Sequence, residues 1–346
     1  MAGPVAGGGG DELRRFRRLA DLTAVVTFLL IVVGGIVRVS ESGLGCGPGG
    51  SGTEGWPLCG GQVIPLVGNE NRVIEFSHRF LATVVVILIG LLCWRAYKHL
   101  RGGHGWAFRG SLIAGVLVLI QAGLGGLTVE HSLAEELVAA HLGTAMVLLG
   151  LLLYLSAKAR SDAAVEARTE RAPVRGLKPY AATAAVLLLC AIVAGGYMAG
   201  TEEEGVNDSG PNIAGAHLAC GKMFPECGSG KFLPFGNNRL TDIHLTHRVF
   251  VYAGTIAIIV LLSVAFARGS RDRLLALAAL LLLCQVMLGA LNVWLGEHGP
   301  LIVAHLTTGT LLWATVISIA YKLAWLPSGS SSRERAPRAE ASAAAA

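Results

Sequence analysis

The sequence predicts an all-α integral membrane protein of eight transmembrane helices, arranged as two similar four-helix bundles. Three observations indicate this fold. Hydrophobic residues make up 53% of the 346 positions and charged residues only 15%, a balance typical of proteins that lie in lipid. Eight apolar runs are each roughly 20 residues long, enough to cross a hydrocarbon core. The two halves of the chain also share short motifs at equivalent positions.

The apolar runs are expected to be helices, because a backbone in lipid must satisfy its hydrogen bonds within the segment and the alternating pattern of a barrel strand is absent. The first run is too long for a cleavable signal and lacks a small-residue cleavage site, so we expect it to remain in the membrane. The predicted helices cover approximately residues 20–38, 75–95, 109–129, 137–157, 179–199, 247–267, 273–295 and 301–322.

Basic residues mark one set of loops. They are frequent before the first predicted helix and in every second connection, and they are sparse in the alternate connections 39–74, 130–136, 200–246 and 296–300. The positive-inside rule therefore predicts two cytoplasmic termini and extracytoplasmic placement of the alternate loops. The net charge of +5 does not indicate nucleic-acid binding, since the basic residues form no single patch.

The expected organisation follows from these assignments. Two four-helix halves are joined by a cytoplasmic linker, and cytoplasmic segments of biased composition, expected to be disordered, flank them. The expected parts are residues 1–19 (N-terminal segment), 20–157 (first half), 158–178 (linker), 179–325 (second half) and 326–346 (tail).

The internal repeat is visible without gaps over the last two helices of each half. QAGLGGLTV from Gln121 corresponds to QVMLGALNV from Gln285, an offset of 164 positions. Both halves begin inside and contain an even number of helices, so they are parallel repeats related by an axis along the membrane normal. Further corresponding pairs are His141 with His305, Gly34 with Gly195, Gly35 with Gly196, His78 with His247, and Arg79 with Arg248.

Each helix predicted to run from outside to inside carries one histidine near its start. The four imidazoles are therefore expected at a similar depth, roughly one turn below the outer surface, two in each half. A single intramembrane histidine is as often structural as functional, but four at duplicated positions favour function. Two imidazoles facing each other in a four-helix bundle are the arrangement that holds a haem iron, whereas zinc needs further donors that do not recur. The residues are His78 and His141 in the first half and His247 and His305 in the second.

The two halves differ beside these histidines. Glu75 lies three residues before His78 and shares its helix face, whereas His244 takes the equivalent place before His247. A carboxylate there can move protons or stabilise positive charge developing on a substrate carbon. The alternative is an interfacial acid exposed to water, favoured by the helix dipole. If Glu75 is functional, the first half performs chemistry and the second half mainly holds a cofactor.

Two arginines directly follow histidines. Arg79 and Arg248 are candidates for pairing with the propionates of a haem, through the planar guanidinium fork that suits carboxylates. Snorkelling of the two side chains to the outer interface explains their positions equally well.

Six short motifs occur along the chain: SGLGC (42–46), WPLCGG (56–61), EFSHRF (75–80), AHLG (140–143), THR (246–248) and AHL (304–306). In these motifs, and over roughly residues 20–325, the sequence resembles the bacterial haem A synthase family. The resemblance implies a membrane oxidoreductase acting on a CH or CH2 group, which oxidises a methyl substituent of haem O through an alcohol to the formyl group of haem A, for the biogenesis of terminal oxidases.

The resemblance also implies roles for particular residues. His247 and His305 would ligate the iron of a resident haem b (iron protoporphyrin IX), His78 and His141 would flank the substrate haem O, and Glu75 would be catalytic. It further implies a disulfide between two cysteines of the first outer loop, Cys46 and Cys59, although a spacer longer than is common in the family separates them. Cys220 and Cys227 form a second candidate pair that closes a short turn.

The implied partners are haem O, membrane lipid, an unknown electron acceptor and the farnesyltransferase that produces haem O. The implied location is the cell membrane, with the cysteine-bearing loops outside. The alternative function is a dihaem b-type cytochrome that only transfers electrons, against which the mismatch of Glu75 with His244 argues. A transporter is disfavoured because broken helix pairs and further midplane charges are lacking, and a thiol oxidoreductase because the sequence has no CxxC motif.

Overall fold

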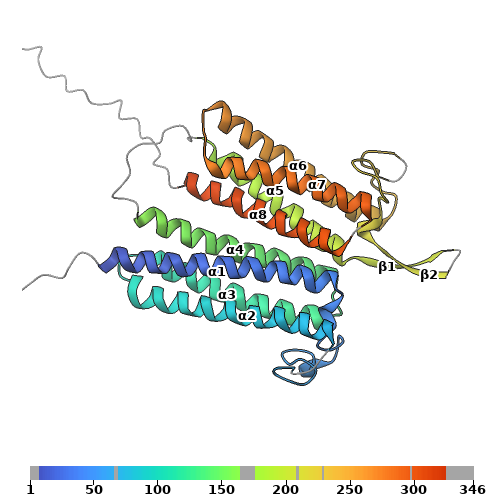
Figure 1. Cartoon of the computed structure of the whole chain (residues 1–346), viewed down its shortest axis with the longest axis horizontal. Coiled ribbons are helices and arrows are strands. Elements are labelled where there is room, and N and C mark those ends of the chain that lie inside the picture. Colours follow the sequence, from blue (N-terminus) through green and yellow to red (C-terminus); the bar gives the residue numbers. More distant parts are fainter. Residues whose placement is uncertain are drawn as a thin grey trace, which may run out of the picture.

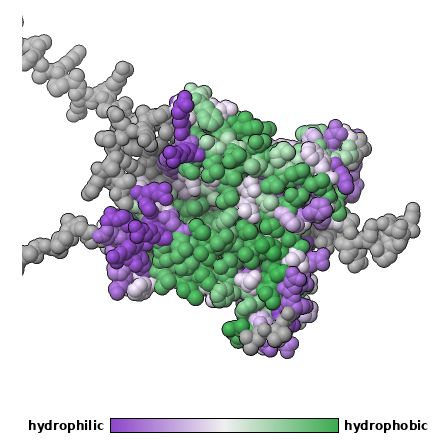
Figure 2. All heavy atoms as spheres, viewed as in Figure 1, coloured by the Kyte–Doolittle hydropathy of each residue, from purple (hydrophilic) through white to green (hydrophobic). Residues whose placement is uncertain are grey.

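A computed structural model describes residues 8–65, 69–163, 176–207, 210–227, 230–296 and 298–324. In these ranges eight helices are long and apolar enough to cross a membrane, which confirms the predicted fold class. Hydrophobic residues cover the middle of the molecule, and hydrophilic residues gather toward its two ends (Figure 2). The helices are α1 (Gly8–Val39), α2 (Glu70–Arg95), α3 (Gly105–Glu130), α4 (Glu135–Ala163), α5 (Lys178–Gly200), α6 (Arg239–Ala267), α7 (Arg273–Leu295) and α8 (Gly299–Ala324).

Several helices begin earlier than the apolar runs predict. Asn69 and Asn238 cap α2 and α6, where their side chains accept hydrogen bonds from the backbone N–H groups of Arg72 (3.0 Å) and Thr241 (2.8 Å). Hydropathy alone does not detect these starts, because the first turns of both helices are polar. The expected N-terminal segment 1–19 is likewise helical from Gly8 onward.

Some of the expected segments lie outside the described residues. These are residues 1–7, most of the linker (164–175) and the tail 326–346.

The eight helices form two groups. In Figure 1, α1–α4 lie together on one side and α5–α8 on the other, and α1 begins at the same end of the molecule at which α8 ends. The opposite end carries the first outer loop, with short helices η1 (Ser42–Leu44) and η2 (Gly52–Glu54). It also carries an antiparallel hairpin of β1 (Glu202–Asn207) and β2 (Gly210–Gly215), which we did not predict. The fold is thus all-α within the membrane and adds a small hairpin outside it.

The two halves pack closely around one tryptophan. Trp313 of α8 is only 2% exposed, and its Nε1–H donates to the carbonyl of Ala185 in α5, at 2.9 Å. A β-carbon placed on Gly150 of α4 would lie 2.8 Å from Cη2 of the same ring. The Tyr321 hydroxyl donates to the Gly150 carbonyl at 3.1 Å. A small residue therefore lets α4 approach α8, as is common between helices in membranes.

Candidate functional site

The four histidines lie at matching positions on their helices. His78 and His247 are eight residues after the starts of α2 and α6, and His141 and His305 are six residues after the starts of α4 and α8. At 1.5 Å per residue these positions are about 12 Å and about 9 Å along the helix. The histidines therefore lie about two turns into their helices. The depth of one turn below the outer surface, expected from the sequence, refers to the membrane and stays a prediction.

The two histidines of each half lie in the same region of the structure. His78 is close enough to His141 in the first half for a charge on one ring to affect the other, and the same holds for His305 and His247 in the second half. Each pair joins two helices that are not consecutive in the chain, namely α2 with α4 and α6 with α8. A site between two such imidazoles would therefore lie inside one four-helix half.

The hydrogen bonds of the imidazole rings fit a haem iron. The Nδ1–H of His247 donates to the carbonyl of Ala191, at 2.9 Å, which leaves Nε2 for a metal. Among the described residues, the buried Nδ1 atoms of His78, His141 and His305 have no hydrogen-bond partner. Because buried polar atoms are rarely left unpaired, these three rings are candidates for binding a ligand, although the unpaired nitrogens are the Nδ1 atoms and not the Nε2 atoms.

Glu75 is a buried residue and not an exposed interfacial acid. Its side chain is 4% exposed. Oε2 accepts a hydrogen bond from the backbone N–H of Cys46, at 2.7 Å, and Oε1 forms an ion pair with Arg79. The carboxylate is thus held on the helix face of His78 by the first outer loop. His244, its counterpart, is also buried, but its Nδ1 donates to the carbonyl of Ala216 at 3.0 Å.

Arg79 and Arg248 hold the outer loops. Nη1 of Arg79 donates to the carbonyls of Gly55 (2.7 Å) and Leu58 (2.6 Å). Arg248 makes the corresponding bonds in the other half, to Met223 (2.9 Å) and Glu226 (2.7 Å), and a longer one to Pro225 (3.3 Å). In the structure both guanidinium groups are held by loop carbonyls, and their pairing with haem propionates stays a prediction.

Both expected disulfides are present, Cys46 with Cys59 and Cys220 with Cys227. The four cysteines are 1–2% exposed. The segments WPLC (56–59) and FPEC (224–227) precede the second cysteine of each pair, and the two arginines bind the same positions in both segments. The outer loops are therefore part of the repeat. The shared aromatic–Pro–X–Cys pattern was the signal that sequence reasoning missed.

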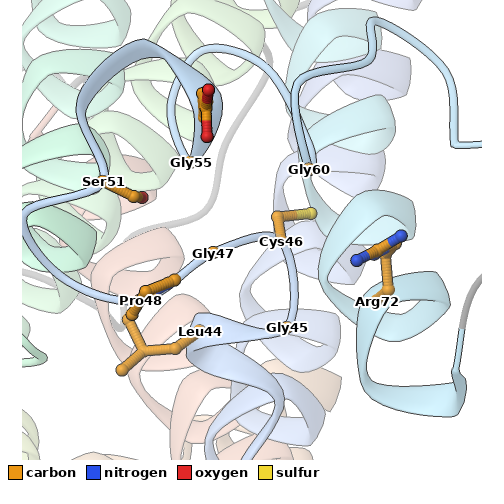
Figure 3. A pocket seen from close by; sticks show the side chains of 10 residues that line it. Leu44, Gly45, Cys46, Gly47, Pro48, Ser51, Gly55, Gly60 and Arg72 are labelled. Atoms are coloured by element: carbon orange, nitrogen blue, oxygen red, sulfur yellow. The ribbon is translucent and has the colours of Figure 1, made fainter.

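A pocket of about 330 Å³ lies in the first outer loop, beside Cys46. Residues 44–48, Ser51, Glu54 and Arg72 contribute to its wall, and Figure 3 shows Cys46 between Gly60 and Gly45, with Arg72 to their right. None of the four histidines lines it. The pocket thus belongs to the disulfide loop and not to the histidine sites.

The chain matches known proteins over most of its length. Residues 17–317 match the family described as cytochrome oxidase assembly protein. A haem A synthase of Shewanella oneidensis is 30% identical, over 91% of this chain and 98% of the relative. Haem A synthases of Shouchella clausii (29% identical, 79% of this chain and 85% of the relative) and Alkalihalophilus pseudofirmus (27%, 75% and 78%) are also similar.

Proposed function

This chain belongs to the family of cytochrome oxidase assembly proteins, and from that premise we infer that it is a membrane oxidoreductase that converts haem O to haem A. A methyl substituent of haem O is oxidised to an alcohol and then to a formyl group, and each stage is a two-electron oxidation of that carbon. The observation that carries the assignment of roles is the difference between two otherwise repeated sites, Glu75 in the first half and His244 in the second.

His247 and His305 of the second half would hold the resident cofactor, haem b. The carbonyl of Ala191 orients the His247 ring so that its Nε2 would be available to the iron. In the structure the side-chain amide of Gln285 donates to Nε2 of His305 at 3.2 Å, so this amide would have to turn away for His305 to bind the iron through that nitrogen. When bound, haem b supplies one-electron transfer between the substrate site and an external acceptor.

The first half binds haem O between His78 and His141, with Glu75 on the face of α2 that carries His78. The carboxylate is excluded from bulk water and fixed by Cys46 and Arg79. The carboxylate therefore needs little reorientation during the reaction. It takes up a proton from the substrate carbon or stabilises positive charge that develops there.

The test replaces Glu75 by Gln, which keeps the shape of the side chain and removes its charge. Haem O or the alcohol should accumulate in extracted haems, while the haem b spectrum stays intact. Unchanged production of haem A would rule out the catalytic role. The matched control is His244→Gln at the equivalent position of the second half, which should not cause the alcohol to accumulate.

The same preparation separates the enzyme from its alternative. A dihaem cytochrome would contain two permanent b haems and no haem O or haem A. His305→Ala should remove the haem b signal from the enzyme and leave binding of haem O measurable. We place the protein in the cell membrane with its disulfide loops outside, and we propose the haem O-producing farnesyltransferase as a partner.

A further inference from the structure

Each of the four histidine rings lies against a glycine of a neighbouring helix in its own half. A β-carbon placed on Gly34 would be 3.1 Å from Cε1 of His78, and one on Gly195 would be 2.9 Å from Cε1 of His247. The corresponding distances are 3.3 Å between Gly125 and His141 and 3.1 Å between Gly289 and His305. Ordinary van der Waals contact needs a longer separation, so any side chain at these positions would displace the imidazole ring.

The glycine that follows in α1 and in α5 contacts the other half. A β-carbon on Gly35 would lie 2.6 Å from Cδ2 of Leu306, and one on Gly196 would lie 2.9 Å from Cδ2 of Leu142. Leu306 is the residue after His305, and Leu142 is the residue after His141. Each Gly-Gly pair therefore lies between a histidine of its own half and the neighbour of a histidine in the other half.

We propose that the pairs Gly34-Gly35 and Gly195-Gly196 are positioning residues that align the two histidine sites with each other. The first glycine of each pair seats a histidine ring of its own half. The second packs against the tip of a leucine that directly follows a histidine of the other half, and so influences how the helix that carries this histidine is placed. The proposal rests on the proposed function for the identity of the ligands, but the contacts themselves do not depend on it.

Packing alone is the competing explanation, because small residues let helices approach in any membrane protein. The two explanations differ in where a substitution acts. Gly35 belongs to the first half, yet its contact leads to His305 of the second-half site. Gly196 belongs to the second half, yet its contact leads to His141 of the first-half site. If these glycines align the two sites, a substitution in one half should change the histidine site of the other half. If they serve packing alone, the same substitution should lower the stability of the whole protein without acting on one site.

The experiment measures both sites in the purified full-length protein after single substitutions. Gly35→Ala should shift the optical and electron paramagnetic resonance spectra of haem b, with little change in the dissociation constant for added haem O. Gly196→Ala should raise the dissociation constant for haem O several-fold and leave the haem b spectra unchanged. Gly90→Ala and Gly123→Ala are matched controls, because a β-carbon at either position meets no atom within 4 Å.

Compensating changes keep the test decisive if a single variant does not fold. Leu306→Ala removes the methyl groups that Gly35→Ala would meet, so the double variant should regain the haem b spectra of Leu306→Ala alone. Leu142→Ala should do the same for Gly196→Ala at the haem O site. Effects confined to the half that carries the substitution, or double variants no better than the glycine variants, would overturn the proposal. Two permanent b haems in the wild type would refute the proposed function, but the crossed effect would still be readable in their spectra.

Discussion

Arg79 directly follows His78, and its guanidinium group joins three parts of the first half. It pairs with Glu75 one turn earlier on α2, and it donates to the carbonyls of Gly55 and Leu58 in the first outer loop. The loop in turn offers the N–H of Cys46 to Glu75. One side chain therefore fixes both the proposed catalytic carboxylate and the loop that covers it.

Replacing Arg79 by Gln should separate the function of the carboxylate from haem binding. Removing one partner of a buried ion pair costs roughly 3–5 kcal/mol, because the remaining charge is left uncompensated. We expect formation of haem A to fall by about tenfold or more, which corresponds to about 1.4 kcal/mol in the barrier, while the haem b spectrum is retained. The measurement is the ratio of haem A to haem O in extracts of membranes.

Arg248→Gln is the control for this prediction, because it releases the outer loop between α5 and α6 without touching a carboxylate. It should disturb haem b and not the ratio of the extracted haems. If both variants lowered haem A formation through the same loss of haem b, Arg79 would serve only as a loop anchor. In the double variant Glu75→Gln, Arg79→Gln the two losses should not add, since the residues act as one unit.

At the scale of single residues, the sequence predicted which residues belong to the candidate site better than it predicted what their side chains contact. The histidine pairing followed from the direction of the helices, and the difference between Glu75 and His244 followed from the repeat. The partners of Arg79 and Arg248 did not follow, because they are backbone carbonyls from loop segments more than 20 residues away in sequence. A carbonyl has no sequence signature, so such a contact appears only once the loop is folded.

The two outer loops that contain disulfides, one between α1 and α2 and one between α5 and α6, link the helices to the candidate site. Each contains a disulfide, each has an aromatic–Pro–X–Cys segment, and each is bound by an arginine of the helix that follows. Because their cysteines are almost fully buried, the disulfides are shielded from large reductants. This shielding favours a structural role for both over a redox relay.

The shielding can be measured by alkylation and mass spectrometry. In the folded, detergent-solubilised protein with mild reductant, Cys46, Cys59, Cys220 and Cys227 should remain unlabelled. All seven should react after unfolding. Rapid labelling of Cys46 and Cys59 in the folded state would instead support a redox relay. Replacing that pair by serines should lower the free energy of unfolding by about 2–4 kcal/mol.

The helix ends show why element boundaries were harder to predict than the helices themselves. Each apolar run lies within one of the eight helices, but α6 begins eight residues before its run, after the Asn238 cap. Those two turns are polar and face the outer loop, where hydropathy is uninformative. The β1–β2 hairpin was missed for a related reason: its strands, EEEGVN and GPNIAG, contain too few β-branched residues to indicate a strand.

At the scale of the whole molecule, the histidine sites and both disulfide loops lie toward one end, opposite the start of α1. Basic residues gather at the other end, for instance Lys98 and Arg101 between α2 and α3. If the positive-inside rule holds, haem O meets Glu75 close to the outer surface and the electrons leave on that side. The orientation in the membrane therefore decides where an electron acceptor must dock.

Two introduced cysteines test this orientation with a membrane-impermeant maleimide. Val63→Cys, in the first outer loop at a position 76% exposed, should be labelled in intact cells. Gly102→Cys, in the connection between α2 and α3 with no atom near its β-carbon, should be labelled only after the membrane is opened. The native cysteines give a low background, because four are paired and three lie in membrane-spanning helices. The reverse pattern would place Glu75 and all four histidines near the cytoplasmic surface, and the acceptor would then have to be a cytoplasmic or inner-leaflet molecule.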